Sequence, residues 1–529
     1  MLKVLSSSNL KSLDLKTIEN KKISSLMLMK RACKRFIKWF ISKFSQSNKI
    51  QIFCGFGNNG GDALLISNML YDRGYNVKVF ILNNKDKISK DCLIQLNNLN
   101  KKIPIYDINQ NMISEIKDSE IIIDGLFGYG LSRKLENPCI DLMKHLNNLK
   151  GKKISIDIPS GISSDKVYGN VFFNSDYVFT FQTPKLSFFF PEYLNLIGKV
   201  VIKDIGLDKN ALDKLLPLAS VIEKSDIKKN IISRSLISHK GTFGHGLIIS
   251  GSKGKMGACV MSCKASLKSG IGLLSVYVPK IGELMIQTSV PEAMVITDKE
   301  NDYISSIPKL EVFNSIGLGP GIGLNKDTEK AIIKLIKVAK IPLVVDADAI
   351  NIISKNKNIL KFLPEGSVLT PHPKEFKRLM GTYKDSNQRI ELQKKLSKKF
   401  KLNILIKGPF SMMTDINGNL FINSTGNPGM ATGGSGDVLT GIITGLIGRG
   451  YKPFNAMTMG VYIHGLSGDI SKKKLGEESL MATDLIDNLP KAFKKIDNWS
   501  FLSNFIIDKF IFLWEKNFYY LYYFYFQSY

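Results

Sequence analysis

A glycine-rich stretch late in the sequence contains the residues best suited to chemistry. From Gly426 to Gly441 the sequence reads GNPGMATGGSGDVLTG, so glycines and small hydroxyl residues precede Asp437. Apolar residues at helical spacing follow, which predicts that the loop opens a helix. Glycine lets backbone amides approach a ligand, and free amides at a helix start bind anions. The stretch therefore suits a phosphate group.

Asp437 is the residue that a simple phosphate site does not explain. A carboxylate repels phosphate unless it transfers a proton or binds a metal ion. An anion-binding loop that carries an acid predicts chemistry on a phosphorylated or phosphate-accepting ligand. An ordinary glycine turn in which Asp437 caps the helix fits the composition equally well.

Length and composition predict a globular protein with two or more domains, because 529 residues exceed one ordinary domain. The net charge of +27 permits a nucleic-acid or membrane partner. The lysines are scattered through the chain, however, which is typical of an A/T-biased genome. The six cysteines and five histidines lack metal-ligand spacing. With no secretory signal and no apolar run of about 20 residues, we expect a cytoplasmic protein without a membrane span.

The first half of the chain alternates strand-like and helical patterns, after an amphipathic helical pattern over 12–44. Such alternation predicts a largely parallel sheet with helices on both faces, and ligands bind at the carboxyl ends of such strands. Strands are expected at 50–54, 77–82, 120–124, 153–158, 177–181 and 199–202, and helices at 62–73, 86–99 and 138–149.

Three of these strand ends are followed by glycine-rich motifs with acidic or amide residues. They read GFGNNGGD (55–62), DGLFGYGL (124–131) and DIPSG (157–161). The first contains G-x-G-x-x-G, but the next strand ends in Asn83-Asn84 instead of a ribose-binding acid, so a nicotinamide-dependent dehydrogenase is not predicted. A single aspartate there is usually a turn or cap residue. Three similar strand ends favour a site.

The three motifs, in this order, resemble the NAD(P)H-hydrate epimerase domain over residues 1–215, with a Rossmann-like three-layer fold. One departure is LMKRAC at 28–33, where the family has an acidic residue and Asn-Ala-Gly. The resemblance implies a potassium ion held by Asn59, Asp124 and Ser160. It implies that Asp157 contacts the substrate near its reacting ring, and we expect it to assist proton transfer. The implied residues for the hydrated dinucleotide are Asn58, Asn59, Gly60, Gly61, Asp62, Gly128, Tyr129, Gly130, Leu131, Ser132, Arg133, Lys134 and Asp157.

The second half repeats the α/β pattern after a charged segment at 207–230 that is expected to be a linker. Its motifs are KGTFGH (240–245), GPGIG (319–323), DADA (346–349), TPHPKE (370–375) and the strand end Lys407-Gly408. Lys407 could contact phosphate or solvent, and His372 could be a turn residue or a ligand contact. No P-loop motif is present. Strands are expected at 247–250, 273–278, 315–319, 342–346, 367–370 and 404–407.

Together with the 426–441 stretch, these motifs resemble the ribokinase-like superfamily, specifically NAD(P)H-hydrate dehydratase, for a domain at 222–490. The resemblance implies a glycine-loop anion hole, ADP as co-substrate and Mg²⁺. Residues implied to contact the hydrated nicotinamide are Ala258, Gly321, His372 and Asp437. Residues implied to bind the nucleotide are Lys407, Gly408, Pro409, Phe410, Ser411 and Gly436.

Both resemblances imply a bifunctional isomerase and lyase that repairs hydrated NADH and NADPH. We expect it to interconvert the R and S hydrates and to dehydrate the S form with ADP, giving AMP and phosphate. Asp437 would remove the proton of the C6 hydroxyl. A ribokinase-like small-molecule kinase and a non-catalytic RNA-binding scaffold remain alternatives. We expect a homo-oligomer without nucleic acid, and a poorly ordered aromatic-rich tail at 493–529.

Overall fold

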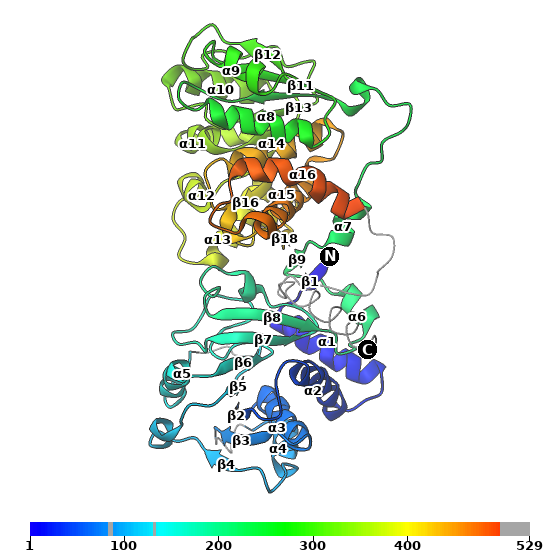
Figure 1. Ribbon diagram of the computed structural model, residues 1–529, viewed down its shortest axis with the longest axis vertical. Helices are drawn as coiled ribbons and strands as arrows, with labels where there is room; N and C mark the ends of the chain where they lie inside the picture. Colours follow the sequence, from blue (N-terminus) through cyan, green and yellow to red (C-terminus); the bar gives the residue numbers. More distant parts are fainter. Residues whose placement is uncertain (83–87, 131–133, 498–529) are drawn as a thin grey trace, which may run out of the picture. The chain divides into compact units, whose positions relative to one another are not determined.

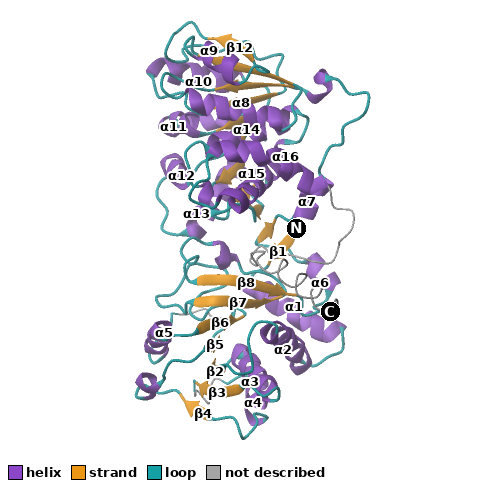
Figure 2. Cartoon of the chain, viewed as in Figure 1, coloured by secondary structure: helices purple, strands orange, loops and turns teal. Residues whose placement is uncertain are grey.

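The structure is a computed structural model that describes residues 1–82, 88–130 and 134–497. The chain forms two compact units, each with its own sheet (Figures 1 and 2). The first comprises Lys3–Leu218. The second comprises Met1–Leu2 and the described chain from Ala219 onward.

The N-terminal unit contains a seven-stranded sheet in the order β4-β3-β2-β5-β6-β7-β8, with every neighbouring pair parallel. Its strands are β2 (Lys49–Cys54), β3 (Asn76–Ile81), β4 (Ile105–Asp107), β5 (Ile121–Gly125), β6 (Lys152–Ile156), β7 (Ser175–Phe181) and β8 (Ile197–Lys203). Its helical segments are α1 (Ser7–Asn20), α2 (Ser25–Ile41), α3 (Asn58–Tyr71), α4 (Lys90–Asn97), η2 (Met112–Glu115), α5 (Cys139–Asn148), η3 (Leu186–Phe189) and α6 (Lys209–Lys214).

Alternation of apolar side chains along the strands gives this sheet a core on each face. Ile52 of β2 belongs to one core together with Phe36 of α2, whereas Phe53 belongs to the other together with Leu142 of α5. The helical pattern expected over 12–44 is two helices, since Ser24 caps the start of α2 by accepting a hydrogen bond from the Met27 amide.

The C-terminal unit contains an eleven-stranded sheet in the order β1-β9-β18-β17-β16-β15-β14-β13-β10-β11-β12. The strands from β16 to β12 in this order are parallel, and β17 is antiparallel to both of its neighbours. The strands are β1 (Leu2–Val4), β9 (Ala219–Val221), β10 (His245–Ile249), β11 (Leu273–Val278), β12 (Met294–Thr297), β13 (Ser315–Leu318), β14 (Leu343–Val345), β15 (Val368–Leu369), β16 (Asn403–Ile406), β17 (Met412–Thr414) and β18 (Leu420–Ile422).

Helices cover both faces of the second sheet. Val344 shares a core with residues of α14, α15 and α16, whereas its neighbours in β14, Leu343 and Val345, share a core with residues of α10 and α11. The helical segments are α7 (Lys224–Lys229), η4 (Lys240–Phe243), α8 (Met256–Lys268), α9 (Gly282–Ser289), α10 (Lys326–Val338), α11 (Ala347–Lys355), η5 (Lys357–Phe362), α12 (Pro373–Met380), α13 (Ser386–Phe400), η6 (Pro428–Met430), α14 (Ser435–Gly448), α15 (Pro453–Leu475) and α16 (Ala482–Asp497).

Helix α14, which carries Asp437, lies unusually close to α8. A Cβ added to Gly441 would stand 2.1 Å from the Ser262 carbonyl oxygen, and one added to Gly445 would stand 2.5 Å from that of Ser266. Glycine is therefore required at both positions for the two backbones to approach. Every residue of the helix from Val438 to Gly448 is buried.

The predicted fold class, α/β with helices on both faces of parallel sheets, is confirmed in both units. The two units divide between Leu218 and Ala219, within the segment 207–230 that was expected to be a linker, but this segment is not irregular because it contains α6, β9 and α7. These elements have three to six residues, too few to show a periodic pattern. Helix α16 continues to Asp497, and the rest of the aromatic-rich tail lies outside the described residues. No helix in the described ranges is long and apolar enough to cross a membrane.

Candidate active sites

The three residues expected to bind potassium meet at the carboxyl end of the first sheet. Asp124, at the end of β5, is fully buried and accepts hydrogen bonds from the Ser160 amide (2.8 Å) and the Ser160 hydroxyl (2.5 Å). The third residue, Asn59, is linked to Ser160 through the backbone of Phe127. The Phe127 carbonyl accepts a hydrogen bond from Asn59 Nδ2 at 3.0 Å, and the Phe127 amide donates one to Ser160 Oγ at 2.9 Å. These groups form one connected cluster.

This cluster fits a monovalent cation. Burial raises the pKa of Asp124, although hydrogen bonds from Ser160, Ser155 and the Leu126 amide lower it. A nearby cation would offset the remaining cost of burying this charge. The available ligands are oxygens, with a single carboxylate among them, as suits a weakly charged hard ion. Over 1–82, 88–130 and 134–497, no group of three or more His, Cys, Asp or Glu could hold a metal ion.

Asp157 is held by one carboxylate oxygen and offers the other. It follows β6 with φ of +64°, a left-handed conformation that aspartate adopts more readily than most residues. Its Oδ1 accepts from Lys185 Nζ (2.5 Å), Thr180 Oγ1 (3.1 Å) and the Phe181 amide (3.1 Å). Its Oδ2 has no hydrogen-bond partner among the residues described. The side chain is therefore oriented in advance, with one oxygen left for a ligand.

Lys185 is the residue of this site that the sequence did not reveal. Its side chain is 1% exposed, and Nζ also donates to Thr180 Oγ1 at 2.8 Å. The only sequence signal is its position two residues beyond Thr183, just after β7 ends. Lysines at such positions are usually exposed, so nothing in the pattern distinguished this one.

The expected dinucleotide-binding segments lie beside these residues. A Cβ on Gly60 would stand 1.9 Å from the Gly55 carbonyl oxygen, which explains the glycine, and Gly128 packs against the Asn59 side chain. Asp62 contacts Cys33, one of the residues that depart from the family pattern, at 3.4 Å, and burial raises the Asp62 pKa. Gly61 is buried, while Asn58, Gly130 and Lys134 are exposed, and Leu131, Ser132 and Arg133 lie outside the described residues.

Asp437 occupies the first turn of α14, next to an ion pair. Burial and the neighbouring charge of Asp346 raise the pKa of Asp437 to about 7, against the opposing effect of Lys407. Lys407 Nζ lies 2.7 Å from Asp346 Oδ1, and Thr440 Oγ1 donates to Asp346 Oδ2 at 2.7 Å. The acid can therefore exchange a proton near neutral pH.

The glycine loop places its backbone directly against this ion pair. A Cβ on Gly436 would stand 3.2 Å from Lys407 Nζ, so a larger residue would crowd the ammonium group. The helix start presents free amides in the same place. Lys407 begins the tight turn 407–411, in which the Gly408 amide donates to Ser411 Oγ at 3.3 Å and which also contains Pro409 and Phe410. An anion here would meet a lysine charge and backbone amides together.

Ala258 and Gly321 also lie together, since a Cβ on Gly321 would stand 3.2 Å from that of Ala258. The neighbouring Lys255 pairs with Asp348 at 3.5 Å, and the Asp348 charge contributes to the raised pKa of Asp437. Ser262 Oγ lies within hydrogen-bond distance of the Ala258 carbonyl (2.9 Å) and of the Asp437 carbonyl (3.0 Å), so Ala258 lies close to the backbone of Asp437.

His372 caps α12, because its Nδ1 accepts from the Lys374 and Glu375 amides at 3.1 and 3.4 Å. Burial lowers its pKa, and the Lys407 charge lowers it further. The His372 side chain is 42% exposed, so it can contact a ligand while it caps the helix. The two roles expected from the sequence, a turn residue and a ligand contact, are therefore compatible. Asp346, Asp348 and Thr440 have no role in the sequence-based account, although DADA was noted as a motif.

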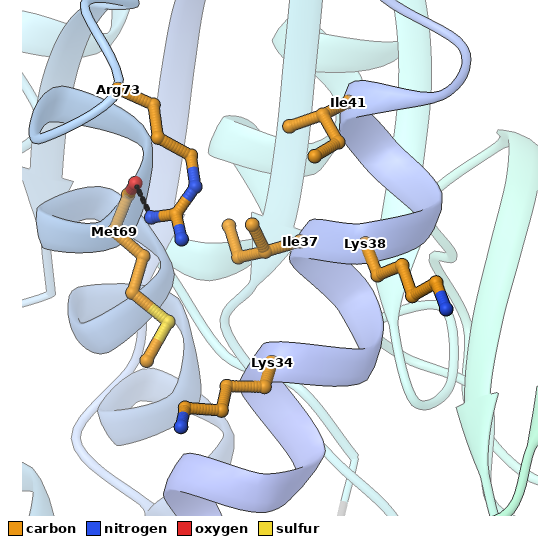
Figure 3. Close-up of a pocket in the computed structure, with 6 residues that line it drawn as sticks. All are labelled: Lys34, Ile37, Lys38, Ile41, Met69 and Arg73. Atoms are coloured by element: carbon orange, nitrogen blue, oxygen red, sulfur yellow. Dashed lines mark hydrogen bonds between the residues drawn. The ribbon is translucent and has the colours of Figure 1, made fainter.

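A pocket lies elsewhere, on α2 and α3. Figure 3 shows its lining, in which Arg73 Nη1 donates to the Met69 carbonyl at 2.7 Å. The other lining residues are Lys34, Ile37, Lys38 and Ile41. None of the expected site residues lines it.

Two family models match separate parts of the chain. The family model described as NAD(P)H-hydrate dehydratase matches residues 246–491, and the one described as YjeF-related protein N-terminus matches residues 25–187. Among solved structures, a ribokinase-like superfamily protein from Enterococcus faecalis is 28% identical, with 53% of this chain and 98% of that chain covered and a TM-score of 0.48. An ADP/ATP-dependent NAD(P)H-hydrate dehydratase from Bacillus subtilis, co-crystallised with ATP/Mg²⁺, is 26% identical, with 53% and 99% covered and a TM-score of 0.47.

Curated relatives match over nearly the whole chain. A protein from Dictyoglomus turgidum is 33% identical, covering 94% of this chain and 99% of its own length. One from Moorella thermoacetica is 31% identical, covering 90% and 93%. Both are named bifunctional NAD(P)H-hydrate repair enzyme, so the family expected from the motifs is confirmed. With this identity and coverage, the chain belongs to the family of bifunctional NAD(P)H-hydrate repair enzymes.

Proposed function

We propose that the chain repairs hydrated NADH and NADPH in two steps, one in each unit. The N-terminal unit interconverts the R and S hydrates. The C-terminal unit dehydrates the S hydrate with ADP and yields the reduced cofactor, AMP and phosphate. The observation that carries the proposal is Asp437, an acid with a pKa of about 7 at an anion-binding helix start beside Lys407. It combines proton transfer with phosphate binding in one place.

In the C-terminal unit, a hydroxyl at C6 of the hydrate is a poor leaving group and a phosphate is a good one. Asp437 accepts the hydroxyl proton while the oxygen attacks the terminal phosphoryl group of ADP. Lys407 and the first amides of α14 stabilise the charge on that group. Asp346 holds Lys407 in place for this. Phosphate then leaves from C6 with its electron pair, a ring proton is lost, and the double bond is restored.

The remaining residues of this unit bind the two substrates. We assign the hydrated nicotinamide to Ala258, Gly321, His372 and Asp437, and the nucleotide to Lys407, Gly408, Pro409, Phe410, Ser411 and Gly436. Mg²⁺ is usually bound through nucleotide phosphates, water and one or two carboxylates. Asp348 fits that need, because its Oδ1 has no hydrogen-bond partner in the described part of the chain. When bound, the ion would neutralise phosphate charge.

In the N-terminal unit, C6 carries both a hydroxyl and the ring nitrogen, so its configuration can invert by ring opening. Asp157 accepts the hydroxyl proton through its open Oδ2 as the C6–N1 bond breaks and its electron pair stays on N1. Rotation and closure give the other epimer. Lys185 pairs with Asp157 and keeps its side chain oriented. Asn59, Asp124 and Ser160 would hold potassium, which supplies positive charge to the site.

The hydrated dinucleotide would be bound beside Asp157 by the two glycine-rich segments. We assign to it the residues predicted from the sequence, which are Asn58, Asn59, Gly60, Gly61, Asp62, Gly128, Tyr129, Gly130, Leu131, Ser132, Arg133, Lys134 and Asp157.

We also propose a cytoplasmic location and a homo-oligomer. Cys33, Cys54, Cys92, Cys259 and Cys263 are buried and form no disulfide among the described residues, which suits a reducing compartment. Leu236 and Ile237 are adjacent and almost fully exposed, at 105% and 91%, as expected of residues covered in an assembly. Light scattering of the purified chain tests the second point, and a monomer at all concentrations would reject it.

The test of the function is turnover with separated epimers. Incubation of the S hydrate with ADP should restore the reduced nicotinamide absorbance, with AMP and phosphate as products. A ribokinase-like kinase would instead accumulate a phosphorylated alcohol. Salt-sensitive RNA binding without turnover would favour the scaffold alternative.

A further inference from the structure

Asp14 lies on the face of α1 that packs inward. Leu10, Leu13 and Thr17 are the buried residues of this helix, and Asp14 lies four residues after Leu10 and three before Thr17. Residues at these spacings share one helix face. A carboxylate placed among apolar neighbours costs free energy unless it is paired or hydrogen-bonded. Its presence there therefore needs an explanation.

The partner of Asp14 is Tyr129, whose hydroxyl donates to Asp14 Oδ2 at 3.0 Å. The Tyr129 ring packs against the apolar cluster that contains Leu10 and Leu13. Asp14 Oδ1 has no hydrogen-bond partner among the described residues. Tyr129 follows Gly128, which contacts the Asn59 side chain, so it stands in the segment assigned to the dinucleotide. Helix α1 thus anchors that segment through one hydrogen bond.

Asp14 also shares an electrostatic environment with the residues around Asp157. Burial raises the pKa of Asp14 to about 6, the Tyr129 hydrogen bond lowers it, the Asp157 charge raises it, and Lys185 lowers it. Burial likewise raises the pKa of Tyr129, with contributions from the charges of Asp14, Asp157 and Asp62. A change in the charge of Asp14 is therefore felt at the proposed epimerase site.

We propose that Asp14 is a positioning residue of the epimerase site, and that its charge decides whether the Tyr129 hydroxyl accepts a hydrogen bond from the hydrated nicotinamide or donates one. The inference rests on the epimerase function proposed above. With Asp14 ionised, the Tyr129 proton points to Asp14, and the lone pairs of the Tyr129 oxygen are left for the ligand. With Asp14 protonated, its carboxyl group donates a hydrogen bond to the Tyr129 hydroxyl oxygen. The Tyr129 hydroxyl then directs its own proton to the ligand. Asp157 accepts the proton of the C6 hydroxyl, so the Tyr129 oxygen serves as acceptor for another donor group of the ligand, and the ionised form of Asp14 is the active one.

The test measures interconversion of purified R and S hydrates without ADP, so that the dehydratase step is silent. For the unmodified chain, kcat/KM should rise as the pH increases through about 6. Asp14→Asn and Tyr129→Phe should each remove this rise and lower kcat/KM by about ten- to hundredfold, the effect of losing a hydrogen bond to a charged group. The double variant should lose no more than either single one. Glu19→Gln, an exposed change of the same charge on α1, is the matched control and should match the unmodified chain.

Two further readouts separate the possible failures. ADP-dependent dehydration of the S hydrate should be unchanged in Asp14→Asn, and its melting temperature should not fall. An unmodified chain that does not interconvert the epimers would reject the proposed function itself. An active chain whose Asp14→Asn variant keeps the same kcat/KM and pH profile would overturn the role of Asp14. A lower melting temperature with an unchanged pH profile would overturn it equally.

Discussion

Replacing Asp437 by Asn should make the C-terminal unit less active and more stable at the same time. The pKa of Asp437 is raised from 3.8 to about 7, chiefly by burial. A group with a raised pKa stabilises the fold below its unfolded pKa, near pH 4, and loses that contribution as the pH rises through about 7. The shift of about three units corresponds to about 4 kcal/mol at most, and solvent at the partly exposed carboxyl reduces this to about 2 kcal/mol.

Asn removes the charge, so at pH 8 the variant should gain about 2 kcal/mol in free energy of unfolding, and the gain should vanish by pH 4. Loss of a general base should lower kcat for ADP-dependent dehydration by about 10²- to 10⁴-fold. The rise in kcat of the unmodified chain near pH 7 should disappear.

Two measurements check this prediction. Hydrogen exchange of the α14 amides at pH 8 and pH 4 reports local stability, and recovery of nicotinamide absorbance reports kcat. Asp487→Asn is the matched control, because this side chain is 72% exposed on α16 of the same unit. The reasoning would be refuted by a variant that keeps a tenth of kcat together with the pH dependence near 7, or by one that is less stable at pH 8 than the unmodified chain.

Three further predictions follow from the contacts. Lys185→Met leaves Asp157 without its buried partner, so the N-terminal unit should lose about 3–5 kcal/mol in urea unfolding and most of its epimerase activity; unchanged stability would contradict this pairing. Gly441→Ala should cost about 1–3 kcal/mol and lower dehydratase kcat, because its Cβ would meet the Ser262 carbonyl, whereas Gly433→Ala, with open space around its Cβ, should leave the free energy of unfolding unchanged. Exchanging potassium for lithium in the buffer should slow interconversion of the epimers, while circular dichroism should show an unchanged fold. An equal rate in both salts would reject the assignment of potassium to Asn59, Asp124 and Ser160.

The sequence was sufficient to predict the parallel strands that carry the sites and the residues at their ends, whereas β1, β4, β9, β12, β17 and β18 were not predicted. Carboxyl ends of parallel strands meet at one edge of a sheet. Asp124, at the end of β5, and Ser160, which follows β6, therefore meet as expected. The same geometry explains why Lys407, at a strand end, reaches Gly436, at a helix start, although Gly436 lies 29 positions later in the sequence. The order of the motifs along the chain is therefore enough to predict which of these residues lie together.

Residues outside these motifs could not be found in the same way. Lys185 follows a strand without a glycine motif, and only its burial shows that it pairs with Asp157. Asp14 lies on a helix whose apolar pattern gives no sign of a site, and its meaning depends on the packing of Tyr129. Short elements such as β9 have too few residues for any period to show. In each case tertiary contacts supply information that local sequence lacks.

The division of labour between the two units is tested most directly by one time course. An equal mixture of R and S hydrates is incubated with ADP and followed by chromatography of both epimers and of the reduced cofactor. The unmodified chain should convert both epimers completely. Asp157→Ala should stop when the S hydrate is exhausted, and Asp437→Asn should release reduced cofactor at least about a hundredfold more slowly while still interconverting the epimers. Loss of both epimers at equal rates in Asp157→Ala, or release of reduced cofactor by Asp437→Asn at the unmodified rate, would contradict the account.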